Sequence, residues 1–269
     1  MKNVIYIGNL HTVAEYILFN SHYNLIGIIC ESDRVNDKLL TFSMVRNVPI
    51  CRVNNDKPIS NAINAQSEDV IFIMCSYGRR VPVEKCNGRL IFNIHFAALP
   101  NYKGRHPSYW ATVSGEQYLG VSIHEVTEQF DRGRIISRHM VPYYIWENED
   151  MIFDKLANET PKLLDELDEF LHGKKTWDIK NSDGGYFRPV TIEDITLRLD
   201  NDSPDLLFNK VRSQTRAGGA LCICGEKKFR LFEIFFSEKT ISADFVIEDK
   251  LYIRYKNNIC IVSGKYNEE

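Results

Sequence analysis

Short, strongly apolar runs alternate with amphipathic segments through the first half of this 269-residue chain. In the amphipathic segments, at 11–19 and 33–46, apolar side chains recur at three-to-four spacing, which predicts helices. The apolar runs predict buried strands, at residues 4–8, 25–30, 48–53, 69–74 and 90–95. Strands this apolar, separated by helices, are typical of a parallel sheet that is covered on both faces. The sequence therefore predicts an α/β fold with a Rossmann-like, mostly parallel sheet and helices on both faces.

The second half of the chain predicts further elements and one domain boundary. A helix is expected at 108–113, followed by strands at 119–126 and 134–141. A long amphipathic helix should span 148–172, with a kink or break at Pro161. The polar, glycine-rich stretch 181–185 predicts a linker. We therefore expect a catalytic domain at 1–180 and a small module at 181–269.

The C-terminal module is predicted to be a mixed or all-β unit that is too slight to fold alone. It begins with a helix at 203–216, and its strands are expected at 220–224, 228–233, 243–247, 250–255 and 259–262. Residues 256–258 predict a hairpin turn between the last two strands. Short edge strands can pair across a two-fold axis, so we expect a homodimer through this module.

The composition is that of a globular protein, with 44% hydrophobic and 26% charged residues. Since no apolar run approaches the roughly 18 residues of a membrane helix, we expect no membrane insertion, and with no secretory leader we expect a cytoplasmic protein. Seven cysteines scattered through apolar runs predict reduced core residues. Cys222 and Cys224 share a strand face, but no second Cys or His pair accompanies them, so we expect no metal site.

The charge balance disfavours a polyanionic partner. The net charge is -3, and residues 181–269 carry 13 Lys or Arg against 14 Asp or Glu. A nucleic-acid-binding protein usually has a basic face. We therefore expect no nucleic-acid partner.

Polar side chains suited to acyl transfer lie at the end of the strand 90–95. Asn93 and His95 are two residues apart and so share one face, and Asp131 follows in a later turn. An amide can donate to a developing oxyanion, an imidazole can donate or take a proton from an amine, and a carboxylate can orient that imidazole. The structural alternative is that Asn93 and His95 merely cap the strand.

Ligands of open α/β sheets bind beyond the carboxyl ends of the strands. The strand ends at 8–10, 75–79 and 93–95 are therefore expected to line one crevice. Gly8 is a lone glycine without the others of a dinucleotide fingerprint, so a nicotinamide-dependent oxidoreductase is a weaker alternative.

Three segments together resemble the formyltransferases that use N10-formyltetrahydrofolate. They are the Asn-x-His strand with its Leu-Pro turn at 92–104, the strand start at 120–124, and the Asp-x-Gly turn at 130–136. The resemblance covers residues 1–175 and, more weakly, 186–194. Ala97, the 103–105 loop and the turn at 216–220 depart from the family pattern.

The resemblance implies how the polar residues would act. Asn93 and His95 would stabilise the oxygen of the formyl group under attack by an amine, and Asp131 would fix the His95 ring. It also implies that tetrahydrofolate is the product. His106, His124 and His139 are expected to be structural, His124 because alternation places it on the face of Ser122.

The resemblance further implies two sets of binding residues. The pterin of the folate would be held by loops that contain Ser76, Tyr77, Gly78, Arg79, Val81, Leu99, Thr127 and Gln129. The acceptor would be held by Tyr102, Lys103, Gly104, Arg105, Tyr186 and Arg188, whose cations lie in loops suited to a pyrophosphate. Tyr109 and Trp110 could stack on a base, or belong to a helix and the core. Leu99 could likewise pack on the pterin or on the core.

The acceptor follows by elimination among the classes of the family. Glycinamide ribonucleotide enzymes resemble the first domain alone, and enzymes acting on methionyl-tRNA carry a basic C-terminal domain. What remains is the amine of a nucleotide-linked deoxyamino sugar, with dTDP as the expected nucleotide, for bacterial surface polysaccharide such as O-antigen. Another amine, methionyl-tRNA or glycinamide ribonucleotide, is the alternative, and a folate- or nucleotide-sugar-binding module without turnover is a further one.

Overall fold

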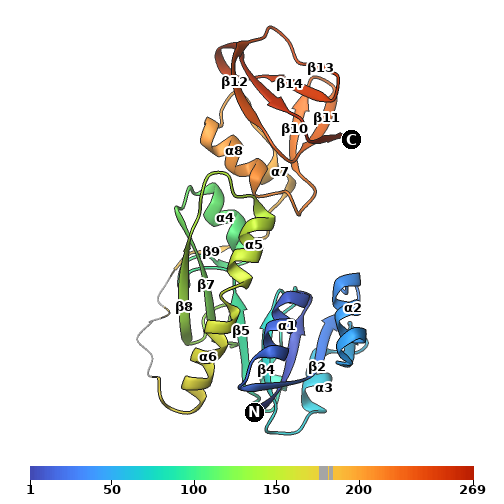
Figure 1. Ribbon diagram of the computed structural model, residues 1–269, viewed down its shortest axis with the longest axis vertical. Helices are drawn as coiled ribbons and strands as arrows, with labels where there is room; N and C mark the ends of the chain where they lie inside the picture. Colours follow the sequence, from blue (N-terminus) through green and yellow to red (C-terminus); the bar gives the residue numbers. More distant parts are fainter. Residues whose placement is uncertain (176–180, 182–183) are drawn as a thin grey trace. The chain divides into compact units, whose positions relative to one another are not determined.

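The chain divides into two compact units in a computed structural model that describes residues 1–175, 181 and 184–269 (Figure 1). The first unit comprises 1–104, 120–141 and 155–186, and the second comprises 105–119, 142–154 and 187–269. The units thus interleave along the chain, whereas a single boundary is expected from the sequence. The predicted boundary at residue 180, and part of the predicted linker, lie outside the described residues.

The first unit is built on a seven-stranded sheet of order β3-β2-β1-β4-β5-β7-β8. Strands β1 to β5 pair in parallel, and β7 runs antiparallel to β5. The strand bounds are β1 Lys2–Gly8, β2 Tyr23–Glu31, β3 Ile50–Val53, β4 Ile71–Cys75, β5 Ile91–His95, β7 Tyr118–Glu125 and β8 Ile135–Pro142. The predicted α/β fold with a mostly parallel sheet is confirmed.

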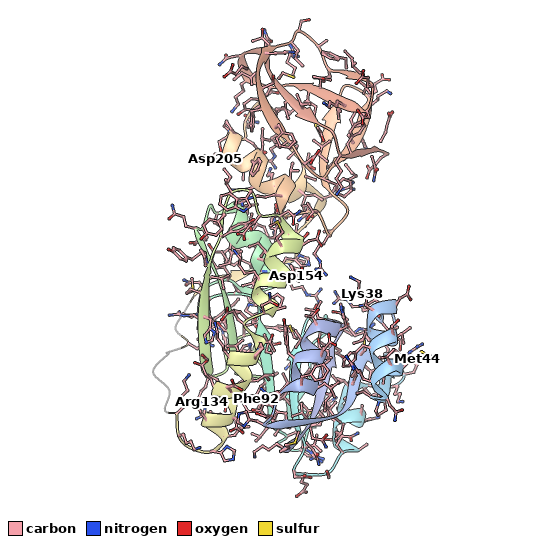
Figure 2. All side chains as sticks on the ribbon, viewed as in Figure 1. Lys38, Met44, Phe92, Arg134, Asp154 and Asp205 are labelled. Carbon is pink, nitrogen blue, oxygen red and sulfur yellow. The ribbon has the colours of Figure 1, made fainter. Side chains whose placement is uncertain are left out.

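Helices cover both faces of this sheet because its strands carry apolar side chains on both. One face packs Ile5, Phe72 and Ile91 with Ile63 of the short helix α3 (Ile59–Asn64). On the other face Phe92, labelled in Figure 2, meets Phe170 of α6 (Thr160–Leu171) edge to face. Helix α6 also packs on α1 (His11–Phe19), while α2 (Asp37–Arg46) follows β2.

The predicted long helix is broken, as Pro161 indicates. It forms α5 (Glu149–Ala157) and α6, and Pro161 lies in the first turn of α6, where its missing N–H costs no helical hydrogen bond. The last turn of α6 is followed by Gly173 at φ 68°, a left-handed conformation that favours glycine.

The second unit combines helices with antiparallel strands. It includes α4 (Pro107–Val113), α7 (Ile192–Ile195), α8 (Pro204–Arg212) and the first part of α5, and α4 packs against α8. The strands form sheets of order β10-β11-β16 and β12-β15-β14-β13, with bounds β10 Ala220–Cys224, β11 Lys227–Leu231, β12 Phe235–Thr240, β13 Phe245–Ile247, β14 Lys250–Arg254, β15 Ile259–Ser263 and β16 Tyr266–Glu268. The contact of α4 with α8 explains why residues 105–119 belong to this unit.

The cysteines are free, as predicted. Cys222 and Cys224 are buried on one face of β10 with their Sγ atoms 3.6 Å apart. Their shared hydrogen bond, together with burial, raises the pKa of the Cys222 thiol. Among the described residues no cluster of His, Cys, Asp and Glu is arranged to hold a metal ion. The helices in the described part of the chain also lack the length and apolarity needed to cross a membrane.

Candidate active site

The three polar strand ends predicted to meet are neighbours in the sheet. Gly8 of β1 pairs with Cys75 of β4, and Cys75 pairs with Ile94 of β5. The loop after β4 therefore begins beside the strand that carries Asn93 and His95.

Asn93 faces a histidine across the antiparallel pair of β5 and β7. Asn93 and His124 are register partners, and Asn93 Nδ2 lies 3.1 Å from His124 Nε2. His124 Nδ1 lies 2.7 Å from the carbonyl oxygen of Glu125, which can only accept, so this nitrogen carries the hydrogen. In the neutral ring Nε2 then accepts a hydrogen bond from the Asn93 amide. His124, 2% exposed, thus orients the Asn93 side chain.

The His95 ring is oriented by the chain segment that follows it. His95 Nε2 lies 3.0 Å from the carbonyl oxygen of Tyr102, to which it donates. The neutral ring therefore keeps its lone pair on Nδ1, the nitrogen that can take a proton. Asp131 Oδ2 is 3.8 Å from His95 Nε2, whereas Asp131 Oδ1 is 3.4 Å from His124 Nε2. The carboxylate expected to fix His95 thus lies between two histidines and nearer to His124.

Asp131 is a buried anion held by backbone and side-chain groups. It adopts φ 53°, is 9% exposed, and accepts the Gly104 N–H at 2.7 Å. Burial by itself would raise the pKa of the Asp131 carboxyl, but the positive charges that His95 and His124 carry when protonated, together with the Gly104 N–H, hold this pKa well below its usual range. The carboxylate therefore stays ionised at neutral pH.

Asn181 holds the turn that contains Asp131. Its Nδ2 donates to the carbonyl oxygens of Asp131 at 2.8 Å and Gly133 at 2.7 Å. A residue expected to be part of a linker therefore braces the left-handed turn on which the carboxylate depends.

The loop after β5 is braced against β7 and β8. Ser122 Oγ accepts the Leu99 N–H at 3.1 Å and donates to the Ala97 carbonyl at 2.7 Å, and Arg138 donates to the Leu99 carbonyl at 2.8 Å. The Leu99–Pro100 peptide bond is cis. A Cβ on Gly120 would lie 2.4 Å from the Ala98 Cβ, so this close approach requires glycine. The loop that leads from His95 to Tyr102 is thus fixed by neighbouring strands.

The predicted pterin-binding residues fall on two loops and in the core. Ser76, at φ 56°, Tyr77, Gly78 and Arg79 follow β4 and are partly exposed. Val81 and Leu99 are buried, which favours the core alternative for Leu99. Thr127 and Gln129 are exposed in the turn before Asp131, where Thr127 Oγ1 donates to the Gln129 carbonyl at 3.0 Å. Their roles in binding stay predictions.

The predicted acceptor-binding residues are distributed over both units. In the first unit Tyr102 adopts the left-handed φ of 56°, and Tyr186 is exposed. The Gly104 N–H is used as a hydrogen-bond donor to Asp131. Lys103, expected in a loop suited to a pyrophosphate, is fully buried in the two-residue strand β6 (Lys103–Gly104). Its N–H donates to the Gly185 carbonyl just before β9 (Tyr186–Phe187).

In the second unit Arg105 is exposed, and the Arg188 guanidinium is engaged by Asp194, at 2.6 and 2.8 Å, and lies over the Trp110 ring. Tyr109 is buried on α4 and donates to the Asp194 carbonyl, which favours the core alternative for it.

His106 and His139, both expected to be structural, each have hydrogen-bond partners. His139 bridges the carboxylates of Glu159 at 2.9 Å and Glu166 at 3.0 Å, and His106 accepts the Val190 N–H at 3.0 Å. His124 differs, since it contacts both Asn93 and Asp131. Strand alternation indicated only that His124 shares a face with Ser122. It did not indicate that Asn93 of β5 lies opposite His124, because that depends on the strand register.

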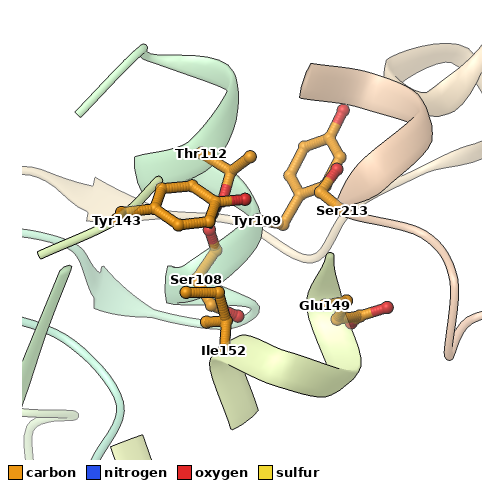
Figure 3. A pocket seen from close by; sticks show the side chains of 7 residues that line it. All are labelled: Ser108, Tyr109, Thr112, Tyr143, Glu149, Ile152 and Ser213. Atoms are coloured by element: carbon orange, nitrogen blue, oxygen red, sulfur yellow. Dashed lines mark hydrogen bonds between the residues drawn. The ribbon is translucent and has the colours of Figure 1, made fainter. Parts of the chain in front are cut away.

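A small pocket occurs in the second unit (Figure 3). It is lined by Ser108, Tyr109, Thr112, Tyr143, Glu149, Ile152 and Ser213. Thr112 Oγ1 donates to the Tyr143 hydroxyl at 3.3 Å, and burial raises the pKa of the Glu149 carboxyl to about 7 although it accepts the Arg216 N–H at 2.9 Å. All these residues belong to the second unit, whereas Asn93, His95 and Asp131 belong to the first.

Comparisons with known proteins agree with the fold and show the family. A family model described as "Formyl transferase" matches residues 26–167, more than half of the chain. A methionyl-tRNA formyltransferase of Streptococcus uberis is 24% identical over 281 residues, covering 98% of this chain and 88% of its own.

Two solved structures resemble the chain over almost its whole length. WlaRD, a sugar 3N-formyl transferase crystallised with dTDP and 5-N-formyl-THF, has a TM-score of 0.70 at 20% identity and covers 98% of this chain and 97% of its own. The N-formyltransferase of Helicobacter canadensis, in complex with folinic acid and dTDP-3-aminofucose, has a TM-score of 0.70 at 17% identity, with 98% of each chain covered. These likenesses establish the shared fold.

Proposed function

Because the chain belongs to the formyl transferase family, we propose that it moves a formyl group from N10-formyltetrahydrofolate to the amine of a nucleotide-linked deoxyamino sugar. The nucleotide we propose is dTDP, and the product is a precursor of bacterial surface polysaccharide such as O-antigen. The reaction takes place in the cytoplasm, in a homodimer formed through the C-terminal module.

The observation that carries formyl transfer is the buried cluster of Asn93, His95, His124 and Asp131. An amide nitrogen bears two hydrogens, so Asn93 can donate one to His124 and the other to the formyl oxygen as negative charge develops on it. His95 Nδ1 takes a proton from the attacking amine, and the imidazolium that results lies 3.8 Å from the ionised Asp131. The chain thus provides an oxyanion donor, a base and a charge that stabilises the protonated base.

The chain also offers groups that fit the folate donor, which supplies an activated one-carbon unit. Ser76 and Gly78 are partly exposed residues of the loop that begins beside the end of β5. A flat pterin ring is recognised by donors and acceptors in its plane, and such loops present them. Tetrahydrofolate-type ligands in two proteins of the same fold support this part of the proposal.

Charge supports a nucleotide-sugar acceptor over tRNA. The stretch 181–269 is slightly acidic, with 13 Lys or Arg against 14 Asp or Glu, and tRNA binding depends on cations that neutralise phosphates. WlaRD and the Helicobacter canadensis enzyme, which have the same fold over 97% or more of their chains, were crystallised with dTDP or a dTDP-sugar. Methionyl-tRNA is the second candidate, favoured by the sequence similarity to the Streptococcus uberis enzyme.

A panel of acceptors tests the proposal. The protein is incubated with N10-formyltetrahydrofolate and, separately, with dTDP- and UDP-linked amino sugars, methionyl-tRNA and glycinamide ribonucleotide, and product mass is measured. We expect a mass gain of one formyl group on a dTDP-amino sugar. If methionyl-tRNA alone were formylated, the proposed sugar acceptor would be wrong and the proposed formyl transfer would still hold.

Two variants test the site itself. Asn93→Ala and His95→Ala remove the oxyanion donor and the base, so each should lower kcat by about 10²–10³-fold. Folded variants with the wild-type rate would show that these residues merely cap the strand. Light scattering after gel filtration of the full chain checks the dimer: a monomeric mass would reject it.

A further inference from the structure

Glu31 is a buried carboxylate that the proposed chemistry does not use. It is the last residue of β2, at the carboxyl edge of the sheet, and is only 2% exposed. A carboxylate this deeply buried is stable only when other groups compensate its charge. Its partners therefore indicate what it does.

The partners of Glu31 belong mainly to the loop after β4. Its Oε2 accepts the backbone N–H of Gly78 at 2.9 Å, and its Oε1 lies 3.3 Å from Arg79 Nε. The Arg79 guanidinium also forms an ion pair with Asp33 at 3.1 Å and donates a hydrogen bond to Asn55 Oδ1 at 3.1 Å. The loop is thus tied by charge to the segments that follow β2 and β3.

The backbone of this loop depends on those contacts. Ser76 is held at φ 56°, a conformation that costs free energy for a residue other than glycine. At Gly78 a Cβ would lie 1.9 Å from Arg34 Nη1 and 3.2 Å from Glu31 Oε1, so the ionic cluster lies directly against the loop backbone. Arg34 Nη1 is itself 3.7 Å from Glu31 Oε2. Glu31 therefore fixes the position of residues 76–79.

We propose that Glu31 is a positioning residue for the formyl donor: it holds the 76–79 loop in the conformation that binds the folate. This inference rests on the proposed function, which places the folate at that loop. When a loop is ordered before binding, less conformational entropy is lost as the ligand binds. Loss of the Glu31 contacts should therefore weaken the affinity for the donor. Glu31 contacts the loop at the Gly78 N–H and the Arg79 guanidinium, so its effect passes through these two residues.

The test uses the full chain and the stable probe 5-formyltetrahydrofolate. In Glu31→Gln the carboxylate charge is lost with the shape kept, so its Kd measured by calorimetry should rise about tenfold, equivalent to about 1.4 kcal/mol. In turnover the effect should fall on the KM for the donor, with the KM for the amine unchanged. Hydrogen exchange should quicken in peptides covering 75–82 and stay at the wild-type rate elsewhere.

Two further variants keep the test decisive. Glu15→Gln is the matched control, because Glu15 pairs with Arg46 at 3.3 Å on the surface of the first unit; it should bind the probe like wild type. Glu31→Asp keeps the charge but moves it away from Gly78 by the length of one methylene. If Glu31→Gln does not fold, the same measurements are made on Glu31→Asp.

The outcomes separate this inference from the proposed function. Weakened donor binding with exchange confined to the loop supports the role of Glu31. Unchanged Kd in a folded Glu31 variant, or faster exchange throughout the first unit, overturns that role and leaves the proposed function standing. A wild-type protein that binds no 5-formyltetrahydrofolate overturns both.

Discussion

Replacing Asp131 with asparagine isolates the contribution of its charge to catalysis. The amide has nearly the shape of the carboxylate and can still accept the Gly104 N–H, so the turn braced by Asn181 should persist. What disappears is the negative charge 3.8 Å from His95 Nε2. At an effective dielectric constant of about 20, a unit charge at that distance stabilises an imidazolium by about 4 kcal/mol.

If His95 becomes protonated in the rate-limiting step, kcat of Asp131→Asn should fall about 10³-fold, because each 1.36 kcal/mol changes the rate about tenfold. The assay is the initial rate of tetrahydrofolate formation at saturating donor and acceptor. Circular dichroism at the assay temperature confirms that the variant is folded.

Asp168→Asn is a matched control. Its carboxylate also contacts two histidines, His22 and His172, each at 3.3 Å, but lies on α6 and not in the cluster of Asn93 and His95. We expect its rate to stay close to that of wild type, because neither histidine that it contacts belongs to that cluster. A folded Asp131→Asn enzyme that turns over within about tenfold of wild type would refute the electrostatic role.

Two predictions concern stability. Burial raises the pKa of Glu149 to about 7, above the value of an unfolded carboxyl, so the contribution of Glu149 to stability is fully present below about pH 4 and is lost as pH rises through 7. The free energy of unfolding should therefore fall by about 2 kcal/mol from about pH 5 to pH 8. Urea titrations measure this fall, and Glu149→Gln should remove it. Gly120→Ala places a Cβ 2.4 Å from the Ala98 Cβ and should destabilise the folded protein by about 1–3 kcal/mol. Gly27→Ala is the control: its Cβ would meet atoms no closer than 3.6 Å, so its stability should be near that of wild type. Equal melting temperatures of the two variants would contradict the close approach at Gly120.

Periodicity predicted the elements that carry strong apolar patterns. The helix 11–19 and the strand 220–224 have the bounds expected from the sequence, since each places its apolar side chains on a buried face. Helix α3 was not predicted because it is short and interrupted by asparagines, and β12 because its side chains are mostly exposed. Local pattern is informative where a segment faces the core and weak where tertiary contacts hold it.

The candidate site shows the same division. The residue types at Asn93, His95 and Asp131, and their motif, pointed to acyl transfer from the sequence alone. The sequence did not show that Lys103 is buried or that Asn181 braces the Asp131 turn, because both depend on backbone partners remote in the chain.

The sequence by itself determined the chemistry available to this protein: a mostly parallel sheet with an amide and an imidazole at one strand end and a carboxylate in a later turn. The tertiary structure decided how these groups are paired. The antiparallel register of β5 and β7 sets His124 directly opposite Asn93, and the turn after β7 brings Asp131 nearer to His124 than to His95. Strand alternation reports which face a side chain occupies, but the residue across from it depends on strand order and register, which form when the whole sheet assembles.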